Sequence, residues 1–248
     1  MTGHGPLLAA AAPVIPNFGS PKAFACERAN RLFCWNWFSK NWDSVLWPAL
    51  RQHVALTAIS VGIGFAIATA LALLAYRHRR FEQPVIVVTT IFYTIPALAL
   101  FELLVPVPGL VLSRTTAEVA LVSYTLLIMF RNTLTGLREV PAEVRDAAAG
   151  MGMTRRQMLV RVELPLALPA IIAGLRIATV STIALATIAA LIGAGGLGGP
   201  ILDAISNSSF KTELIAAGAL AVGLAIAADG LLVGVQRLLT PWARARTV

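Results

Sequence analysis

The segment VALTAISVGIGFAIATALALLAY, residues Val54 to Tyr76, decides the class of fold. It contains no Asp, Glu, Lys or Arg, and it exceeds the about 20 residues that an α-helix needs to cross a bilayer. It also lacks the strict apolar–polar alternation of a strand in a membrane barrel. Because lipid offers the backbone no hydrogen-bond partners, a segment of this kind must be helical.

The composition of the whole chain agrees with this segment. Hydrophobic residues make up 57% of the 248 residues and charged residues 13%. Soluble domains average about 45–50% apolar and about 25% charged residues. The sequence therefore excludes a soluble enzyme or nucleic-acid-binding domain, although the net charge is +8.

Four further segments are long and apolar enough to span a membrane. They are Pro84–Pro106, Ala117–Leu137, Pro169–Ile192 and Leu214–Leu239. We predict an all-α membrane protein with about five transmembrane helices. Its parts are an extracytoplasmic N-terminal segment (1–48), a transmembrane domain (49–240) and a cytoplasmic tail (241–248).

Basic residues in the loops predict the orientation of these spans. One side would hold Arg77, Arg79, Arg80, Arg131, Arg138, Arg145, Arg155, Arg156, Arg161, Arg237, Arg244 and Arg246. The other would hold Lys22, Arg28, Arg31, Lys40, Arg51, Arg114 and Lys211. The richer side is expected to be cytoplasmic, so the N-terminus lies outside and the C-terminus inside.

The N-terminal segment is rich in tryptophan, at Trp35, Trp37, Trp42 and Trp47. Tryptophan gathers at membrane–water interfaces, so we expect a helix lying on the outer leaflet. An aromatic cage for a cationic ligand is the alternative. The two cysteines of this segment, Cys26 and Cys34, either form a disulfide in an oxidising compartment or stay unpaired.

The loop at 138–168, between spans three and four, is longer than a connector requires. Pro141 suits a first helical position, Glu143 suits the first turn, and Gly150 and Gly152 would end that helix. Thr154-Arg-Arg-Gln157 is a capping-box pattern that begins a second helix. Because Pro165 follows, Leu164 is expected to leave the helix.

The first of these helices offers a smooth face. Ala147, Ala148, Ala149 and Gly150 carry small or no side chains, so another protein can approach closely. The alternative is a solvated amphipathic hairpin with no partner.

Residues of this loop resemble the EAA signature of bacterial ABC-importer permeases. Asp146-Ala147-Ala148, then Gly150, then Leu164-Pro165 follow its pattern of Glu-Ala-Ala, Gly and Leu-Pro, with Asp146 where Glu is usual. The resemblance implies an ATPase-coupling hairpin. Its residues would be Glu143, Asp146, Ala147, Ala148, Gly150, Met151, Gly152, Thr154, Leu164 and Pro165.

Further motifs resemble the osmoprotectant branch of this family, over about residues 50 to 240. They are Thr94–Leu100, Phe130–Gly136, Gly150–Thr154, Val162–Leu166 and Ala186–Gly198. The resemblance implies import of glycine betaine, carnitine, choline or proline betaine across the bacterial inner membrane. It also implies a second permease subunit, identical or paralogous, two ATPase subunits and an external binding protein.

No catalytic or cofactor-binding constellation stands out in the sequence. Gly193-Ala-Gly195-Gly-Leu-Gly198 matches G-x-G-x-x-G, but it follows a long apolar helix, so we interpret it as a turn. The chain has no G-x-x-x-x-G-K-[ST] segment. ATP and Mg²⁺ are therefore expected on the partner ATPase, and no cofactor on this chain. The three scattered histidines indicate no metal site, and His53 is expected at the membrane interface.

Charged residues within spans are rare and indicate function by default. The candidates are Glu102, Arg176 and Asp229, for which helix–helix pairing or nearness to a span end is the alternative. Aromatic faces with a distant carboxylate suit a quaternary ammonium. The candidate translocation path is therefore Phe92, Tyr93, Pro96, Phe101, Glu102 and Asp229.

Three other functions remain open. An ABC permease for amino acids or methionine would share the hairpin. An ion-coupled secondary transporter or channel would show inverted repeats or broken helices. A membrane enzyme would need a catalytic constellation.

Overall fold

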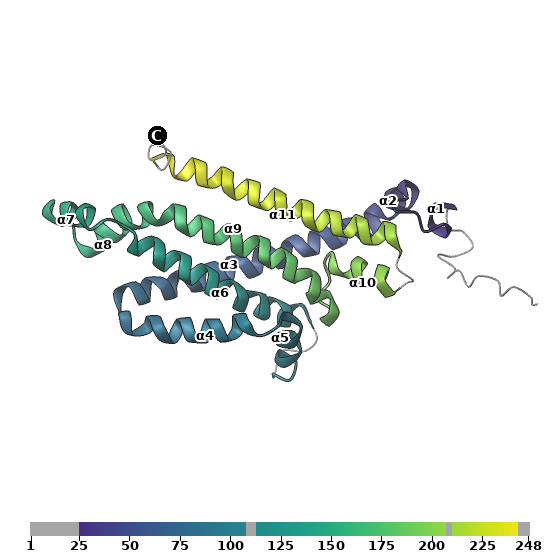
Figure 1. The fold of residues 1–248 in the computed structure, drawn as a ribbon, viewed down its shortest axis with the longest axis horizontal. Helices are drawn as coiled ribbons and strands as arrows, with labels where there is room; N and C mark the ends of the chain where they lie inside the picture. The colour runs from purple at the N-terminus through teal and green to yellow at the C-terminus, as the bar shows by residue number, and fades with distance from the viewer. Residues whose placement is uncertain (1–24, 108–112, 207–209, 243–248) are drawn as a thin grey trace, which may run out of the picture.

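The computed structural model describes residues 25–107, 113–206 and 210–242. Within these ranges every regular element is helical and none is a strand. Figure 1 shows a long bundle whose helices run along one axis and alternate in direction. The fold class predicted from the sequence is confirmed.

Four helices are long and apolar enough to cross a membrane, and a bent pair of helices has the length and composition of a broken span or a re-entrant loop. The four are built on α3 (Trp47–Arg77), α6 (Arg114–Arg138), α9 (Leu164–Ile188) and α11 (Lys211–Leu239). The predicted spans one, three, four and five are therefore confirmed. The predicted boundary at residue 48 stays a prediction, since the helix before it continues into α3.

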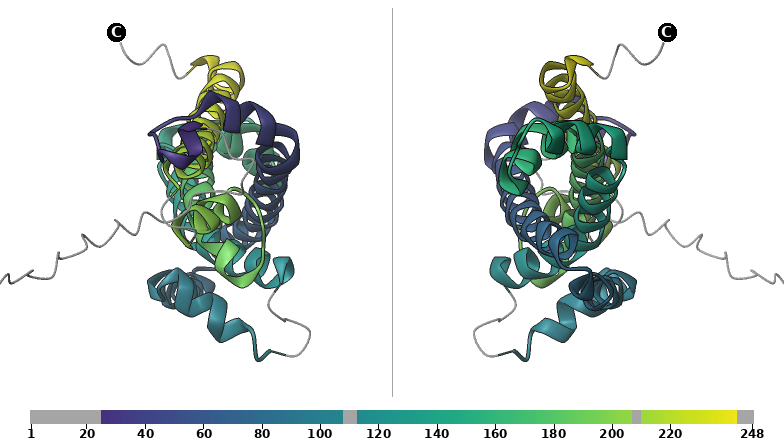
Figure 2. Two further views of the ribbon diagram at one scale, coloured as in Figure 1. Left: turned by 90° about the vertical axis from the view of Figure 1, so that its right-hand side faces the viewer. Right: turned by 90° about the vertical axis from the view of Figure 1, so that its left-hand side faces the viewer.

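The second predicted span is not one straight helix, which corrects the expectation for Pro84–Pro106. It consists of α4 (Glu82–Thr94) and α5 (Ala97–Leu104), which meet at 102°. Pro96 has no N–H to donate, and the residue before a proline is pushed out of the helical region. Ile95 accordingly has ψ 128°, and α5 turns aside from the axis of α4 (Figure 2).

Short elements gather at the two ends of the bundle (Figure 1). One end, called the hairpin end, carries η2 (Arg79–Phe81), α7 (Ala142–Gly150), α8 (Arg155–Met158) and η3 (Leu159–Glu163). The other, called the α10 end, carries α1 (Ala25–Arg28), α2 (Trp35–Asn41), η1 (Trp42–Leu46), η4 (Ala189–Ile192) and α10 (Gly198–Ser206).

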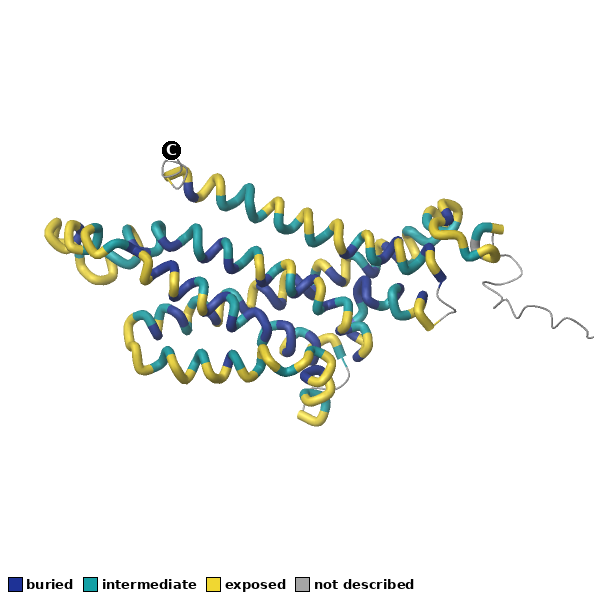
Figure 3. Tube along the Cα trace, viewed as in Figure 1, coloured by how far each residue is buried: buried dark blue, intermediate teal, exposed yellow. Residues whose placement is uncertain are grey.

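Helix α6 lies at the centre and packs against α3 and α9. Small residues permit this close approach, as is usual in membrane helices. A Cβ on Gly64 would lie 1.7 Å from Oγ1 of Thr125, and one on Gly174 would lie 2.5 Å from Cβ of Asn132. Figure 3 shows buried positions on these helices, whereas α7, α8 and much of α11 are exposed.

The N-terminal segment is held against the start of α11. The structure joins Cys26 and Cys34 in a disulfide. Within that loop, the side chain of Asn30 accepts the Lys211 N–H at 3.0 Å, and the carbonyl of Arg31 accepts the Thr212 hydroxyl at 3.3 Å. The loop therefore supplies a cap to a helix far away in the sequence.

The tryptophans divide into two groups. Trp37 and Trp42 pack against a buried cluster of Leu46, Ala216 and Ala217, and so support the fold. Trp35 and Trp47 are 66% and 49% exposed, as expected for side chains at a membrane interface. The segment is not a separate surface helix, because α2 continues through the π-helical turn η1 into α3.

His53 is fully buried, which corrects the expectation of an interfacial position. Its Nδ1 accepts the N–H of Leu197 at 3.2 Å, so the proton is on Nε2, which donates to the carbonyl of Ile183 at 3.1 Å. The glycine-rich turn predicted between spans four and five places Leu197 here. Gly195 and Gly196 have φ near +76°, a conformation that glycine adopts without strain.

Candidate functional site

The hairpin between α6 and α9 has the predicted helix–turn–helix form. Helix α7 ends in a Schellman motif, in which the N–H of Met153 binds the carbonyl of Ala148 and the N–H of Gly152 binds that of Ala149. Gly152 holds the left-handed residue, with φ +76°. Gly150 is simply the last residue of α7, so the turn depends on Gly152 and not on Gly150.

The second half of the hairpin begins as predicted and continues differently. Thr154 and Gln157 form the capping box, with Thr154 N–H donating to Gln157 Oε1 at 2.8 Å. Leu164 was expected to leave the helix, but α8, η3 and α9 are continuous. The π-helical turn η3 ends two residues before Pro165, and its wider spacing accommodates a ring that would otherwise meet a carbonyl of the preceding turn.

The predicted coupling residues lie mainly on the outer surface of the hairpin. Glu143, Asp146, Ala147, Gly150, Met151, Gly152 and Thr154 are exposed, and Leu164 and Pro165 are half-buried. Ala148 is instead buried and holds α7 to the rest of the protein. A Cβ added to Gly150 would meet no atom within 4 Å. This surface can therefore accept a partner without any rearrangement of α7.

Side chains also connect the hairpin to the bundle. The hydroxyl of Tyr76, in the last turn of α3, donates to Oε1 of Glu163 at 2.7 Å. It also accepts a hydrogen bond of 3.3 Å from Nη1 of Arg145, which is on α7. Beside this group, Arg138 and Glu82 form a two-fold ion pair between α6 and α4.

A pocket of about 440 Å³ lies where α4 and α5 meet. Tyr93, Pro96, Tyr124, Ser181 and Thr182 contribute to its lining. The rings of Tyr93 and Tyr124 are edge to face at 6.0 Å, and the Tyr124 hydroxyl donates to the carbonyl of Ile95. Because Pro96 cannot donate, the carbonyl of Phe92 has no helical partner.

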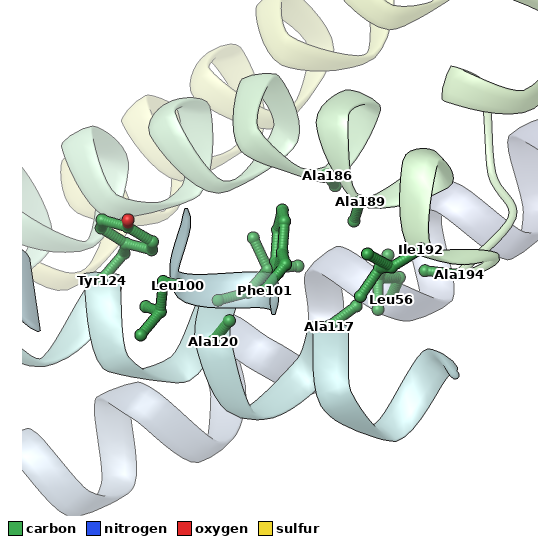
Figure 4. Close-up of a cluster of buried hydrophobic side chains, with 11 residues drawn as sticks. Leu56, Leu100, Phe101, Ala117, Ala120, Tyr124, Ala186, Ala189, Ile192 and Ala194 are labelled. Atoms are coloured by element: carbon green, nitrogen blue, oxygen red, sulfur yellow. The ribbon is translucent and has the colours of Figure 1, made fainter. Parts of the chain in front are cut away.

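The pocket contains two of the six predicted path residues, Tyr93 and Pro96. Phe101 is instead fully buried in a core cluster with Leu56, Ala117 and Ala186 (Figure 4). Phe92 packs against the same cluster, and Glu102 is exposed outside the pocket lining. Phe92 of α4 and Phe101 of α5 thus meet the same core from the two sides of the bend at Pro96.

Asp229, the remaining candidate, is paired. Its carboxylate receives two hydrogen bonds from Arg176, at 2.7 Å from Nε and 2.9 Å from Nη2. The pair joins α11 to α9 away from the pocket residues. Helix pairing, the alternative given for this acid, is thus present in the structure.

We expect Asp229→Asn to reduce the amount of folded protein, because an amide cannot compensate the guanidinium charge of Arg176 within the membrane. Fluorescence-detected gel filtration of the extracted protein measures this. The double variant Asp229→Asn/Arg176→Gln, which restores a neutral hydrogen-bonded pair, should recover the yield. A full yield of Asp229→Asn combined with altered uptake would instead assign Asp229 to the path.

Comparison with known proteins identifies the family. The family model for the binding-protein-dependent transport system inner membrane component matches residues 60–244. The chain belongs to this family. The resemblance to ABC-importer permeases that the hairpin motif indicated is thereby confirmed.

Curated relatives of the permease carry related names. It is 42% identical to the osmoprotectant import permease protein OsmW of Salmonella typhimurium, covering 77% of this chain and 89% of that one. It is 38% identical to the glycine betaine/carnitine/choline transport system permease protein OpuCD of Bacillus subtilis, covering 83% and 88%. It is 37% identical to the choline transport system permease protein OpuBB of Bacillus subtilis, covering 77% and 86%.

A solved structure agrees with the fold of the permease. The inward-facing MetNI methionine ABC transporter contains a chain that matches with a TM-score of 0.72. The match covers 79% of the permease and 96% of that chain, at 23% identity. At this identity the likeness shows the fold alone.

Sequence reasoning missed part of the pocket. Tyr124, Ser181 and Thr182 belong to α6 and α9, and nothing local to them marks a site. Pro96 was the available signal, because a proline inside a long apolar segment marks a place where a spanning helix can break.

Proposed function

We propose that this chain is the membrane-spanning subunit of an ATP-driven importer of quaternary-ammonium osmoprotectants: glycine betaine, carnitine, choline or proline betaine. The observation that carries the proposal is the 37–42% identity, over at least 77% of the chain, to permeases named for such solutes. A methionine or amino-acid importer is the alternative, and it shares only the fold. The bend in the second span does not favour a secondary transporter, because the chain belongs to the family of binding-protein-dependent transport components.

The hairpin is proposed to dock on a cytoplasmic ATPase subunit. Its exposed face carries small side chains at Ala147 and Gly150, beside the acidic Asp146. Movement of the ATPases would then shift the hairpin and switch the permease between inward-facing and outward-facing states. A second permease subunit and an external binding protein complete the proposed assembly, in which ATP and Mg²⁺ bind to the ATPase.

The proposed orientation in the bacterial inner membrane has the N-terminus outside and the C-terminus in the cytoplasm. The distribution of arginine supports it, because the hairpin end carries Arg79, Arg138, Arg145 and Arg155 in its loops and helix ends. The disulfide of Cys26 and Cys34 belongs to the opposite end, which is compatible with an oxidising exterior.

The pocket at the α4–α5 bend is proposed as part of the translocation path. The end of α4 directs partly negative carbonyl groups toward it, which favours a cation. The faces of Tyr93 and Tyr124 provide the aromatic surface that attracts a quaternary ammonium, whose methyl groups cannot donate conventional hydrogen bonds. In membrane transporters, broken helices commonly place their ends at the substrate.

Uptake of radiolabelled glycine betaine tests the proposed function. The permease is expressed with its neighbouring transport genes in a strain that lacks osmoprotectant importers. Unlabelled choline, carnitine, proline and methionine serve as competitors. Betaine uptake that requires ATP supports the proposal. Uptake that only methionine or another amino acid inhibits would replace the osmoprotectant by the alternative substrate.

The role of the pocket predicts different effects of two substitutions at Tyr93. Tyr93→Leu removes the aromatic face and should lower the maximal rate of betaine uptake about tenfold, the size expected for a cation–π contact. Tyr93→Phe keeps the ring and should retain most of the rate. Equal rates for the two variants, at equal amounts of protein in the membrane, would exclude the aromatic contribution.

A further inference from the structure

Tyr76 lies where three parts of the chain meet at the hairpin end. It belongs to the last turn of α3, its hydroxyl donates to Glu163 of η3, and it accepts from Arg145 of α7. Glu163 is only 5% exposed. One hydroxyl therefore connects the hairpin helix to two spanning helices, since η3 runs directly into α9.

The two hydrogen bonds use the hydroxyl in a defined direction. A guanidinium can only donate and an ionised carboxylate can only accept, so Tyr76 accepts from Arg145 and donates to Glu163. Glu163 is buried, and a buried carboxylate without a partner is strongly unfavourable. The bond from Tyr76 thus holds the start of α9 to the end of α3.

Helix α7 itself has few attachments to the bundle. Most of its residues are exposed, Ala148 is its buried residue, and Arg145 is half-buried. Glu163 lies in the π-helical turn η3, whose geometry is less regular than that of the α-helices on either side. A displacement of α7 can therefore reach α3 and α9 through Arg145 and Tyr76.

We propose that Tyr76 is a positioning residue that transmits movement of the hairpin to α3 and α9. The proposal rests on the proposed function, in which an ATPase moves the hairpin. When the connection through Tyr76 is cut, movement of α7 reaches the spanning helices only through the chain links to α6 and α8. Less solute is then transported for each ATP hydrolysed.

The experiment uses the whole complex in liposomes, with binding protein and glycine betaine, and measures uptake and ATP hydrolysis together. Arg145→Met cuts the connection to α7 and leaves the bond from Tyr76 to Glu163. We expect uptake to fall about tenfold, the effect of losing a hydrogen bond to a charged group. ATP hydrolysis should stay within about twofold, as for substitutions that leave the fold intact.

Arg138→Met is the matched control. It removes an arginine at the same end, whose ion pair with Glu82 joins α4 to α6. Its ratio of ATP hydrolysed to solute imported should equal that of the wild type. A parallel fall of uptake and hydrolysis in Arg145→Met, or loss of the ATPase during purification, would mean that Arg145 acts in docking and would overturn the proposal.

The double variant Tyr76→Phe/Glu163→Met separates transmission from folding. It removes the hydroxyl and the carboxylate together, so no buried charge is left without a partner. The proposal predicts a folded complex that hydrolyses ATP and imports about tenfold less, again the effect of the lost hydrogen bonds. Wild-type uptake by this variant would show that the group only stabilises the fold.

A fluorescent label at the exposed Leu191, introduced through Leu191→Cys in η4 just beyond the far end of α9, gives a readout that needs no solute. Its ATP-driven emission change should disappear in Arg145→Met and persist in Arg138→Met. An unchanged signal in Arg145→Met would overturn the proposal. If the wild type shows the signal but imports no betaine, the proposed substrate fails while the role of Tyr76 stands.

Discussion

Gly150→Val is expected to abolish uptake while the permease still inserts and folds. Gly150 is the exposed last residue of α7, and a Cβ there meets no atom within 4 Å. Valine is also compatible with a helix, so the free energy of unfolding should hardly change. The branched side chain would instead protrude from the face on which the ATPase is proposed to dock.

The size of this effect follows from packing. Forcing extra carbon atoms into a close-packed contact costs about 1–3 kcal/mol, which corresponds to about a 5- to 150-fold loss of affinity. Purification of the complex measures how much ATPase remains bound, and betaine uptake measures the consequence. Gly150→Ala should fall between valine and the wild type.

Gly223→Val provides the matched control for this prediction. Gly223 is also exposed on a helix, α11, and its Cβ would likewise meet nothing within 4 Å. It is far from the hairpin, so uptake should be retained. Normal transport by Gly150→Val would contradict the docking role of this surface.

Among these variants, His53→Ala should lower the free energy of unfolding the most. The imidazole is fully buried and satisfies the N–H of Leu197 and the carbonyl of Ile183. Alanine leaves both backbone groups without a partner and creates a cavity. Together these losses should lower the free energy of unfolding by about 3–5 kcal/mol.

Thermal unfolding followed by gel filtration measures this loss. His78→Ala is the matched control, because His78 is exposed beyond the end of α3 and should change stability by only about 0.5 kcal/mol. Equal unfolding temperatures for the two variants would mean that the buried hydrogen bonds of His53 contribute nothing measurable.

Features encoded in consecutive residues were predictable from the sequence. The apolar lengths of α3, α6, α9 and α11 define spans without reference to other parts of the chain. The capping box of Thr154 and Gln157 is likewise contained in four residues. The disulfide was left open, because pairing depends on the compartment and on geometry that residue types do not specify.

Features created by distant contacts were not predictable in the same way. Nothing near His53 announces that Leu197, 144 residues later, will bind it. The bend after Thr94 was readable in Pro96, but a proline in a membrane helix commonly produces only a kink. Because the bend was not anticipated, the sequence did not show that Phe101 lies in the core and that Glu102 lies outside the pocket lining.

The attachment of the N-terminal loop to the start of α11 has a mechanical consequence. The buried residues of α11, Thr212, Ala216, Ala217 and Ala221, all lie in its first half. Toward its end, Leu238 and Leu239 are 81% and 50% exposed, and Figure 1 shows this part diverging from α9. The start of α11 is therefore held by Asn30 and by the core, whereas its second half is tied to α9 mainly by the ion pair of Asp229 with Arg176. A rotation about the start of the helix would displace Leu239 the most, and this ion pair would limit the displacement.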